Sequence, residues 1–331
     1  MILIFFISFF IISLSIIGYG HLILKLTNIN INKISVGYLG LSGIFLINIY
    51  SYFLSIFTNH TLLSNSLLIL LGFVYFLIKN KRNFFQDNRI YILLIIIFFL
   101  GILIGKPHDD FEYYHFPYTH YLTQFDSIYG MGHLNHGFRT PSSIFYLNSV
   151  FNLPLIGNYS FSFGPAYYMI FANIILIDYL KIKNIQKNIF LIYFILFVLL
   201  FINIFFYRIG EHGTDRSAQV LIFILVLELL IFLNIKINFK NQISLLAILI
   251  SLVVSLKAFY IIYFVFTVLI IDYLVRNKKQ KIKELFNIIF KNIIIFFAII
   301  NITLIFFTYF KNTGCLIYPL SITCFENIEW A

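Results

Sequence analysis

The chain has 331 residues, of which 61% are hydrophobic and only 11% are charged. Soluble domains carry roughly a quarter charged residues, so this composition excludes a soluble globular protein and indicates an integral membrane protein. The net charge of +10 would favour nucleic acid as the partner of a soluble chain. Here the Lys and Arg residues lie in short clusters between apolar runs, where they signal topology. We therefore expect membrane lipids around the protein and no nucleic acid.

Long apolar runs predict an all-α fold, because the strands of a membrane barrel would show alternating hydrophobicity instead. We expect a polytopic bundle of about 10 transmembrane spans that forms a single integral membrane domain over residues 1–331. The first run lacks a basic start and a cleavage site, which predicts a retained helix rather than a signal peptide. The predicted spans are residues 2–24, 35–57, 62–78, 90–105, 161–180, 190–207, 218–233, 243–256, 259–275 and 293–310.

Basic residues follow every second predicted span. They include Lys25, Lys79, Lys181, Lys236 and the basic run 276–291. Because Lys and Arg are enriched in cytoplasmic loops, this side is predicted to be cytoplasmic and the N-terminus to face outward. The larger outward-facing segments are then the long loop 106–158, the short loop 208–217, the junction at Lys257 and the tail 311–331.

The long loop 106–158 is the one extended polar interval, and it concentrates the titratable groups of the chain. An apolar stripe at helical spacing predicts an amphipathic interfacial helix over residues 111–125, with Glu112 and His115 away from the centre of the stripe. A second interfacial helix is predicted from Thr140 as its N-cap and Pro141 in its first turn. Both helices are expected to lie in the loop, outside the bundle.

Asp109 and Asp110 follow Pro107 at the outer end of the fourth predicted span, and two interpretations are open. A carboxylate at the boundary between lipid headgroups and water can act as a general base toward a hydroxyl acceptor. Burial by neighbouring aromatic residues would raise its pKa toward a useful value. Alternatively, the two acids only cap the helix that follows.

Histidines near these acids raise the question of a metal. His108 and His115 with the neighbouring carboxylates form a set rich enough to bind a cation, but the set lacks the H-E-x-x-H spacing of a helical metal site. We expect no metal and no cofactor, with a divalent cation as the less favoured alternative. A histidine that hydrogen-bonds a phosphate or orients a carboxylate, and a histidine that is merely solvated, are also open.

Two outward-facing basic residues are candidates for binding a phosphate. Arg216 lies in the charged loop 208–217, which predicts either a salt-bridged cluster or an arginine that holds a phosphate oxygen. Lys257 stands alone between two apolar runs, and a lysine within a membrane is costly enough to indicate a function. The alternative for Lys257 is a side chain that reaches the membrane surface from a helix turn.

The tail 311–331 contains both cysteines, Cys315 and Cys324, nine positions apart. In an oxidising compartment they could form a disulfide, and two unpaired thiols are an equally open alternative. The tail ends without a basic residue or a predicted helix, so we expect a re-entrant or interfacial loop, or the truncated end of a longer product.

The run Asp110-Phe-Glu-Tyr-Tyr-His115 resembles the D-x-x-x-Y-H start of the first large outer loop in the GT-C superfamily of membrane glycosyltransferases, in particular the bacterial envelope polysaccharide type. The later segment GMGHLNHGFRTPSSIFYLNS is similar to the same group. The resemblance covers roughly residues 90–220. It departs from the family in having three spans before the loop, which divides the chain into a three-span extension (1–89), a GT-C-like core (90–310) and the tail (311–331).

This resemblance implies a polyprenyl-phosphate-linked sugar as donor and a lipid-linked or surface glycan as acceptor. Transfer of a hexosyl or pentosyl group would occur at the periplasmic face of the bacterial inner membrane, in surface polysaccharide or glycolipid biosynthesis. Carried over by position, Asp110 is the catalytic base and Asp109 the second carboxylate. The candidate substrate-binding residues are His115, Glu112, His136, Arg139, Arg216 and Lys257.

Three other functions are open. A transporter or flippase of lipid-linked sugars would require charged residues within the spans, and only Glu228 and Lys257 fit this requirement. A protein like an O-antigen polymerase would rely on arginines in its outer loops. A non-catalytic membrane scaffold would tolerate the replacement of Asp110 by Asn.

Overall fold

The computed structural model describes residues 1–27, 34–80, 84–105, 109–205, 214–235, 239–276, 287, 289–325 and 327–330. Within these ranges the chain forms helices joined by turns, and the one β-bridge found there pairs Cys315 with Cys324. The predicted all-α fold is therefore confirmed for the part of the chain that the structure describes.

A helix covers each predicted span. These helices are α1 (Ile2–Lys25), α2 (Val36–Phe57), α3 (Leu62–Lys79), α5 (Arg89–Ile104), α8 (Phe163–Leu180), α10 (Ile189–Phe205), α11 (Thr214–Asn234), α12 (Phe239–Leu256), α13 (Val265–Arg276) with η7 (Ala258–Phe264) before it, and α15 (Ile293–Thr313). Seven helices among the described residues are long and apolar enough to cross a membrane, whereas α5, α10 and α12 are shorter apolar helices. The fold is consistent with a multi-pass membrane protein, and the count of ten spans stays a prediction.

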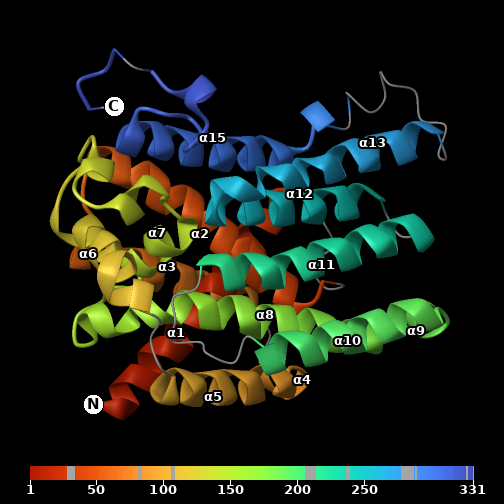
Figure 1. The fold of residues 1–331 in the computed structure, drawn as a ribbon. Coiled ribbons are helices and arrows are strands. Elements are labelled where there is room, and N and C mark those ends of the chain that lie inside the picture. Colours follow the sequence, from red (N-terminus) through yellow and green to blue (C-terminus); the bar gives the residue numbers. More distant parts are fainter. Residues whose placement is uncertain are drawn as a thin grey trace.

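The long helices run side by side through the molecule, and the short helices α6 (Phe116–Gln124) and α7 (Ser143–Ser149) lie at one end, near both termini (Figure 1). Helix α2 occupies the interior, because it packs against α1, α7, α8, α12 and α15. The first three helices therefore contribute directly to the core of the bundle.

Glycines allow α1 to approach its two neighbours closely. A Cβ atom added at Gly20 would lie 1.8 Å from the carbonyl oxygen of Leu39 in α2, and one added at Gly43 would lie 1.8 Å from that of Ile16 in α1. Small residues at helix contacts let backbones come together in a membrane, where packing rather than the hydrophobic effect drives association. A side chain at either position would push α1 and α2 apart.

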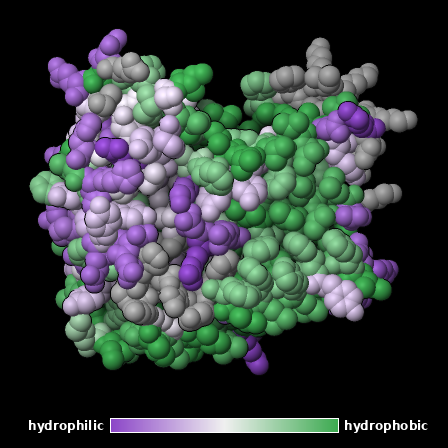
Figure 2. Space-filling view, in the orientation of Figure 1, coloured by the Kyte–Doolittle hydropathy of each residue, from purple (hydrophilic) through white to green (hydrophobic). Residues whose placement is uncertain are grey.

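Polar and apolar residues are segregated along the bundle (Figure 2). Hydrophilic residues gather at the end that carries α6 and α7, and a broad hydrophobic surface extends from there along the long helices. At the opposite end lie α9 (Lys183–Gln186) and the end of α13 at Arg276. This division matches a bundle whose middle faces lipid and whose two ends face water.

The long loop folds into short helices, and two details of its prediction are wrong. All residues of α7 are buried, so this helix is enclosed by protein rather than lying at a membrane interface. Its N-cap is Ser142, whose hydroxyl accepts from the Ile144 amide at 3.4 Å. Thr140, the predicted cap, instead donates to the carbonyl of Gly137 at 3.3 Å. The helix begins later than predicted because Ser142 provides the competing cap.

Buried hydrogen bonds fasten the loop to the bundle. Asn312 near the end of α15 donates to the Tyr118 hydroxyl at 2.8 Å and to the Phe138 carbonyl at 3.0 Å. The hydroxyls of Tyr118 and Tyr146 lie 3.0 Å apart, and Ser51 of α2 donates to the Tyr146 carbonyl at 2.7 Å. Because unpaired polar groups are costly in the interior, these bonds determine how the loop sits on the helices.

His60 joins α2 to α7 at the same end. Its Nδ1 lies 2.5 Å from Ser149 Oγ, and its Nε2 lies 3.0 Å from the Ser51 carbonyl. Burial lowers the pKa of His60 to about 4, and the positive charge of Lys311 lowers it further against the opposing effect of the Ser51 carbonyl. The imidazole is therefore neutral in the folded protein at neutral pH.

This pKa predicts an acid-sensitive fold. As the pH falls from about 6.5 toward 4, the unfolded chain takes up a proton at His60 and the folded protein does not, so stability present above pH 6.5 is lost. Between pH 7 and pH 5 we expect a loss of roughly 2 kcal/mol, measured as thermal unfolding in detergent, and a smaller loss in His60→Gln. The exposed His136→Gln serves as control. An unchanged pH dependence in His60→Gln would contradict this assignment.

Candidate functional site

The two predicted catalytic acids precede η2 (Phe111–His115), a single π-helical turn. Asp110 has helical backbone angles, φ −63° and ψ −20°, and its side chain makes no cap hydrogen bond. Asp109 is also helical and is exposed. The cap-only interpretation is therefore wrong for Asp110, because a capping residue has a non-helical backbone and bonds the first amides of the helix. π-helical turns occur frequently at functional sites.

The Tyr114 hydroxyl lies where two carboxylates meet. It donates a hydrogen bond to Asp110, and it also feels the charge of Asp215. Burial, followed by these two negative charges, raises the pKa of Tyr114 to about 12. Gly137 leaves the space that its ring occupies, because a Cβ atom there would lie 2.2 Å from Tyr114 Cγ. The tyrosine therefore remains a hydrogen-bond donor toward Asp110 at neutral pH.

Asp215 brings two further segments to this point. It lies in the first turn of α11, and Lys257 Nζ contacts its two carboxylate oxygens at 2.9 and 3.0 Å. The Tyr260 hydroxyl donates to the same carboxylate at 3.2 Å. Lys257 has an extended backbone, φ −161° and ψ 134°, at the start of η7. It thus interrupts the chain between α12 and η7.

We call Asp110, Tyr114, Asp215, Lys257 and Tyr260 the outer acid cluster. Its members come from the long loop, from α11 and from η7, and they meet at the end of the bundle that carries the polar surface. The cluster offers two carboxylates that can accept a proton and one ammonium that can balance negative charge. Arg216, the next residue of α11, is half-buried.

The other predicted site residues of the long loop differ in their exposure. Glu112 and His136 are exposed. His115 is buried, with its ring centroid 4.3 Å from that of Tyr114 and 5.2 Å from that of Phe145, so the prediction that it lies off the apolar face is wrong. The reason is that the π-helical turn changes the angular position of residue 115 relative to a regular helix.

Arg139 connects the loop to the tail. Its Nε donates to the Gly132 carbonyl at 3.0 Å, and its Nη1 donates to the Tyr318 hydroxyl at 3.4 Å. The guanidinium also lies over the Tyr318 ring at 5.9 Å. These contacts give Arg139 a structural role. Its partners, Gly132 and Tyr318, are not members of the outer acid cluster.

The tail folds back over the loop. Cys315 and Cys324 are joined in a disulfide. His133 Nε2 lies 3.0 Å from the Trp330 carbonyl, and the Trp330 ring packs against Tyr129 at 5.0 Å. The tail therefore contacts the loop within residues 129–139. The loop members of the outer acid cluster, Asp110 and Tyr114, lie before this part of the loop in the chain.

An open apolar groove of about 560 Å³ lies beside η2. It is bounded by the end of α5, by η2 and α6, and by η5 (Gly157–Ser162). The lining residues are Ile102, Gly105, Phe111, Phe116, Ile156, Gly157, Asn158, Tyr159 and Ser162. Phe111, in the wall of this groove, directly follows Asp110 in the chain.

Sequence reasoning missed three members of this cluster. In the sequence, Tyr114 belongs to the apolar stripe of the helix predicted over residues 111–125. Asp215 is one of several charged residues in the loop 208–217, and Tyr260 falls in the predicted span 259–275. One feature of the sequence points to Asp215, which is adjacent to Arg216, a candidate phosphate-binding residue. Its pairing with Lys257 spans 42 positions in the sequence, which no local pattern reveals.

Several predicted residues fall outside the described ranges. These are His108 in the long loop and the members Arg208, Glu211 and His212 of the short charged loop. Among the residues that the structure describes, no group of three or more His, Cys, Asp or Glu side chains is placed to hold a metal ion.

The fold and the site describe an all-helical protein with several potential membrane spans and a polar cluster at one end. A family model described as a domain of unknown function, DUF8201, matches residues 1–331, so the chain belongs to this family. Neither the curated proteins nor the solved structures include a match to this chain.

The Lys257–Asp215 pair should contribute little to stability. Both side chains are partly exposed, at 37% and 49%, and such pairs contribute at most about 1 kcal/mol. We expect Lys257→Met to unfold within about 1 kcal/mol of the unmodified protein in detergent. Lys181→Met is the matched control, because Lys181 pairs with Asp178 at 2.8 Å on the surface. A loss well above that of the control would assign Lys257 a structural role.

Proposed function

We propose that this protein is a glycosyltransferase that uses a polyprenyl-phosphate-linked sugar at the outer face of the bacterial inner membrane. Its role would lie in surface polysaccharide or glycolipid biosynthesis. The observation that carries the proposal is the position of Asp110, which is hydrogen-bonded to the half-buried Tyr114 near Asp215 and directly precedes Phe111 in the wall of an open apolar groove. The resemblance of residues 110–115 to the GT-C loop agrees with this choice.

In the proposed reaction Asp110 acts as the general base. It accepts the proton of an acceptor hydroxyl as the hydroxyl oxygen attacks the anomeric carbon of the donor sugar. The bond between that carbon and the phosphate oxygen breaks, and the lipid phosphate leaves with the electron pair. The Tyr114 hydrogen bond orients Asp110 for this step. Asp109, which is exposed, has the secondary role.

Positive charge is needed where the phosphate departs. Lys257 can supply it, although its ammonium is bound to Asp215 in this structure, so a phosphate would replace part of that contact. Arg216 follows Asp215 in the first turn of α11 and is the second candidate. A guanidinium suits phosphate well because it can donate two parallel hydrogen bonds.

The groove next to η2 suits the lipid part of such a donor. Its walls are mainly apolar, and it begins at the end of α5, a helix whose surface is largely apolar and exposed. A prenyl chain could therefore pass from lipid along α5 to the loop while its phosphate stays near the polar end. The basic end of the bundle would face the cytoplasm, which directs the long loop outward.

Glu228 supports transport as a second candidate function. It is buried in α11, and its carboxylate accepts hydrogen bonds from Tyr38 of α2 and Tyr179 of α8. Acids inside a bundle often mark a path for ions or substrates. The same contacts also join three helices, which is the structural alternative.

Replacing Asp110 tests the transferase proposal. In a strain lacking the gene, complementation with Asp110→Asn should reduce the surface glycan at least roughly 100-fold, because a general base contributes at least that factor. Asp87→Asn, which changes an exposed acid of α4 (Phe84–Asp87) outside the cluster, is the control and should restore the glycan. Equal membrane levels are checked by immunoblot, and the glycan is profiled by mass spectrometry.

Full restoration by Asp110→Asn would overturn the proposed base. Glu228→Gln separates the two candidate functions in the same assay. Under transport, Glu228→Gln should abolish the glycan while Asp110→Asn preserves it. Under transfer, the pattern should be reversed.

A further inference from the structure

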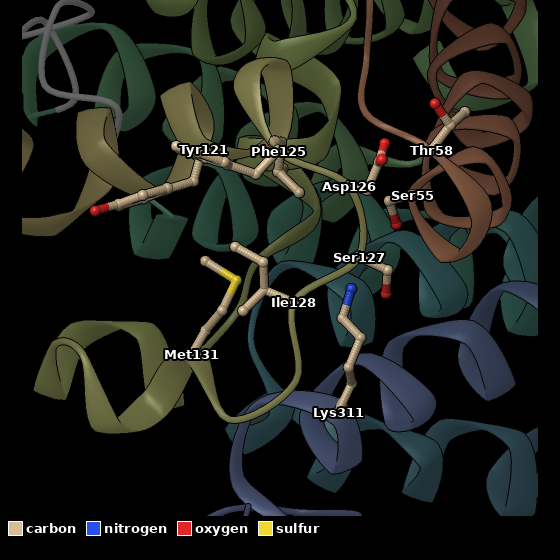
Figure 3. Close-up of a pocket in the computed structure, with 10 residues that line it drawn as sticks. Ser55, Thr58, Tyr121, Phe125, Asp126, Ser127, Ile128, Met131 and Lys311 are labelled. Carbon is tan, nitrogen blue, oxygen red and sulfur yellow. The ribbon is translucent and has the colours of Figure 1, made fainter.

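Lys311 is a cation buried away from the outer acid cluster. It lies in the last turn of α15, and only 3% of its surface is exposed. Its ammonium points into a small pocket between the end of α2 and the loop segment that carries Phe125, Asp126 and Ser127 (Figure 3).

The ammonium has no acceptor among the described residues. Asp126 lines the same pocket, but its carboxylate is turned toward the end of α2, where it accepts from the Asn59 amide at 3.0 Å (Figure 3). No ion pair joins Asp126 and Lys311 in the described part of the chain. Lys311 therefore differs from Lys257, whose charge is balanced by Asp215.

Ser127 adds a second unused donor to this pocket. Its Oγ is buried and has no hydrogen-bond partner. Figure 3 shows the Ser127 hydroxyl next to the Lys311 ammonium. A buried hydroxyl without a partner beside the ammonium of a largely buried lysine is unusual, because burying an unpaired polar group is costly and burying an unpaired charge is more so.

The neighbouring His60 supplies no counter-charge for Lys311. His60 lies close enough for the charge of Lys311 to help lower its pKa, and its own two ring nitrogens are occupied by Ser149 and Ser51. The imidazole is therefore neither a counter-ion nor a free acceptor for Lys311. A negative ligand is the species that this arrangement lacks.

The size of the space restricts the ligand. The cavity measures about 10 Å³, which is the room of a single water-sized group. A tetrahedral phosphate or a carboxylate group has several heavy atoms and exceeds it. A monatomic halide is an anion close to this size, and it accepts hydrogen bonds from both an ammonium and a hydroxyl.

From this geometry we propose that Lys311 and Ser127 bind a halide ion, chloride being the physiological one. The ion receives hydrogen bonds from Lys311 Nζ and Ser127 Oγ, and it neutralises the lysine. Because the pocket joins α15, the end of α2 and the loop, a bound ion also holds these three segments together. The site is independent of the proposed transfer reaction.

The test uses the full chain in detergent at constant ionic strength. Thermal unfolding is followed while sodium gluconate is replaced by sodium chloride or sodium bromide. We expect both halides to raise the unfolding temperature by several degrees in the unmodified protein, because a ligand that binds only the folded state stabilises it. Ser127→Ala should need a roughly tenfold higher chloride concentration, because it removes one hydrogen bond to a charged ligand.

Lys311→Met, which keeps the length of the side chain, should abolish the chloride effect, whereas the surface variant Lys181→Met should retain it. If Lys311→Met does not fold, Ser127→Ala and the anomalous signal of bromide beside Lys311 decide the case. The proposal is overturned if chloride and gluconate give the same unfolding temperature. It is also overturned if inorganic phosphate stabilises the protein and halides do not, or if Lys311→Met keeps the chloride effect.

Discussion

The end of α15 holds the polar half of this molecule together. Asn312 bonds Tyr118 and the Phe138 carbonyl, and the carbonyl of Lys311 accepts from the Gly130 amide at 2.8 Å. These contacts seat a long polar loop in a protein whose other surfaces are largely apolar. A loop that is buried must satisfy its backbone groups within the protein, and the last turn of α15 supplies the partners for two of its segments. The position of the long loop at this end of the bundle depends on these contacts with α15. We call these contacts the seat of the loop.

Two polar sites flank the seat and differ in how their charges are balanced. In the outer acid cluster, Lys257 and Tyr260 both bind Asp215, and Tyr114 connects this pair to Asp110. Tyr260 is buried, whereas Lys257 and Asp215 are partly exposed. Lys311 is largely buried, and its ammonium faces the Ser127 hydroxyl. The outer acid cluster suits a proposed ligand that binds and dissociates, and the Lys311 pocket suits a proposed ion that remains bound.

The basic end of the bundle contrasts with this outer end. Hydrogen bonds from Tyr38 and Tyr179 to Glu228 link α2, α8 and α11 there, and Asp178 accepts from Ser35 at the start of α2 at 2.7 Å. These contacts join α2, α8 and α11 at that end of the bundle, whereas the apolar groove lies beside η2 at the other end.

The sequence by itself determined the helices, because apolar runs that are long enough to cross a bilayer have no other way to satisfy their backbone. It also located the polar loop and singled out Asp110 and Lys257 by their unusual surroundings. Only the tertiary structure decided that Asp215 is the partner of Lys257, that α7 is buried, and that Lys311 lacks an acceptor. Periodicity reports which face of a helix is apolar, but it carries no information on which distant segment meets that face. Those pairings depend on helix packing and on the seat of the loop, and both arise from contacts between residues far apart in the chain.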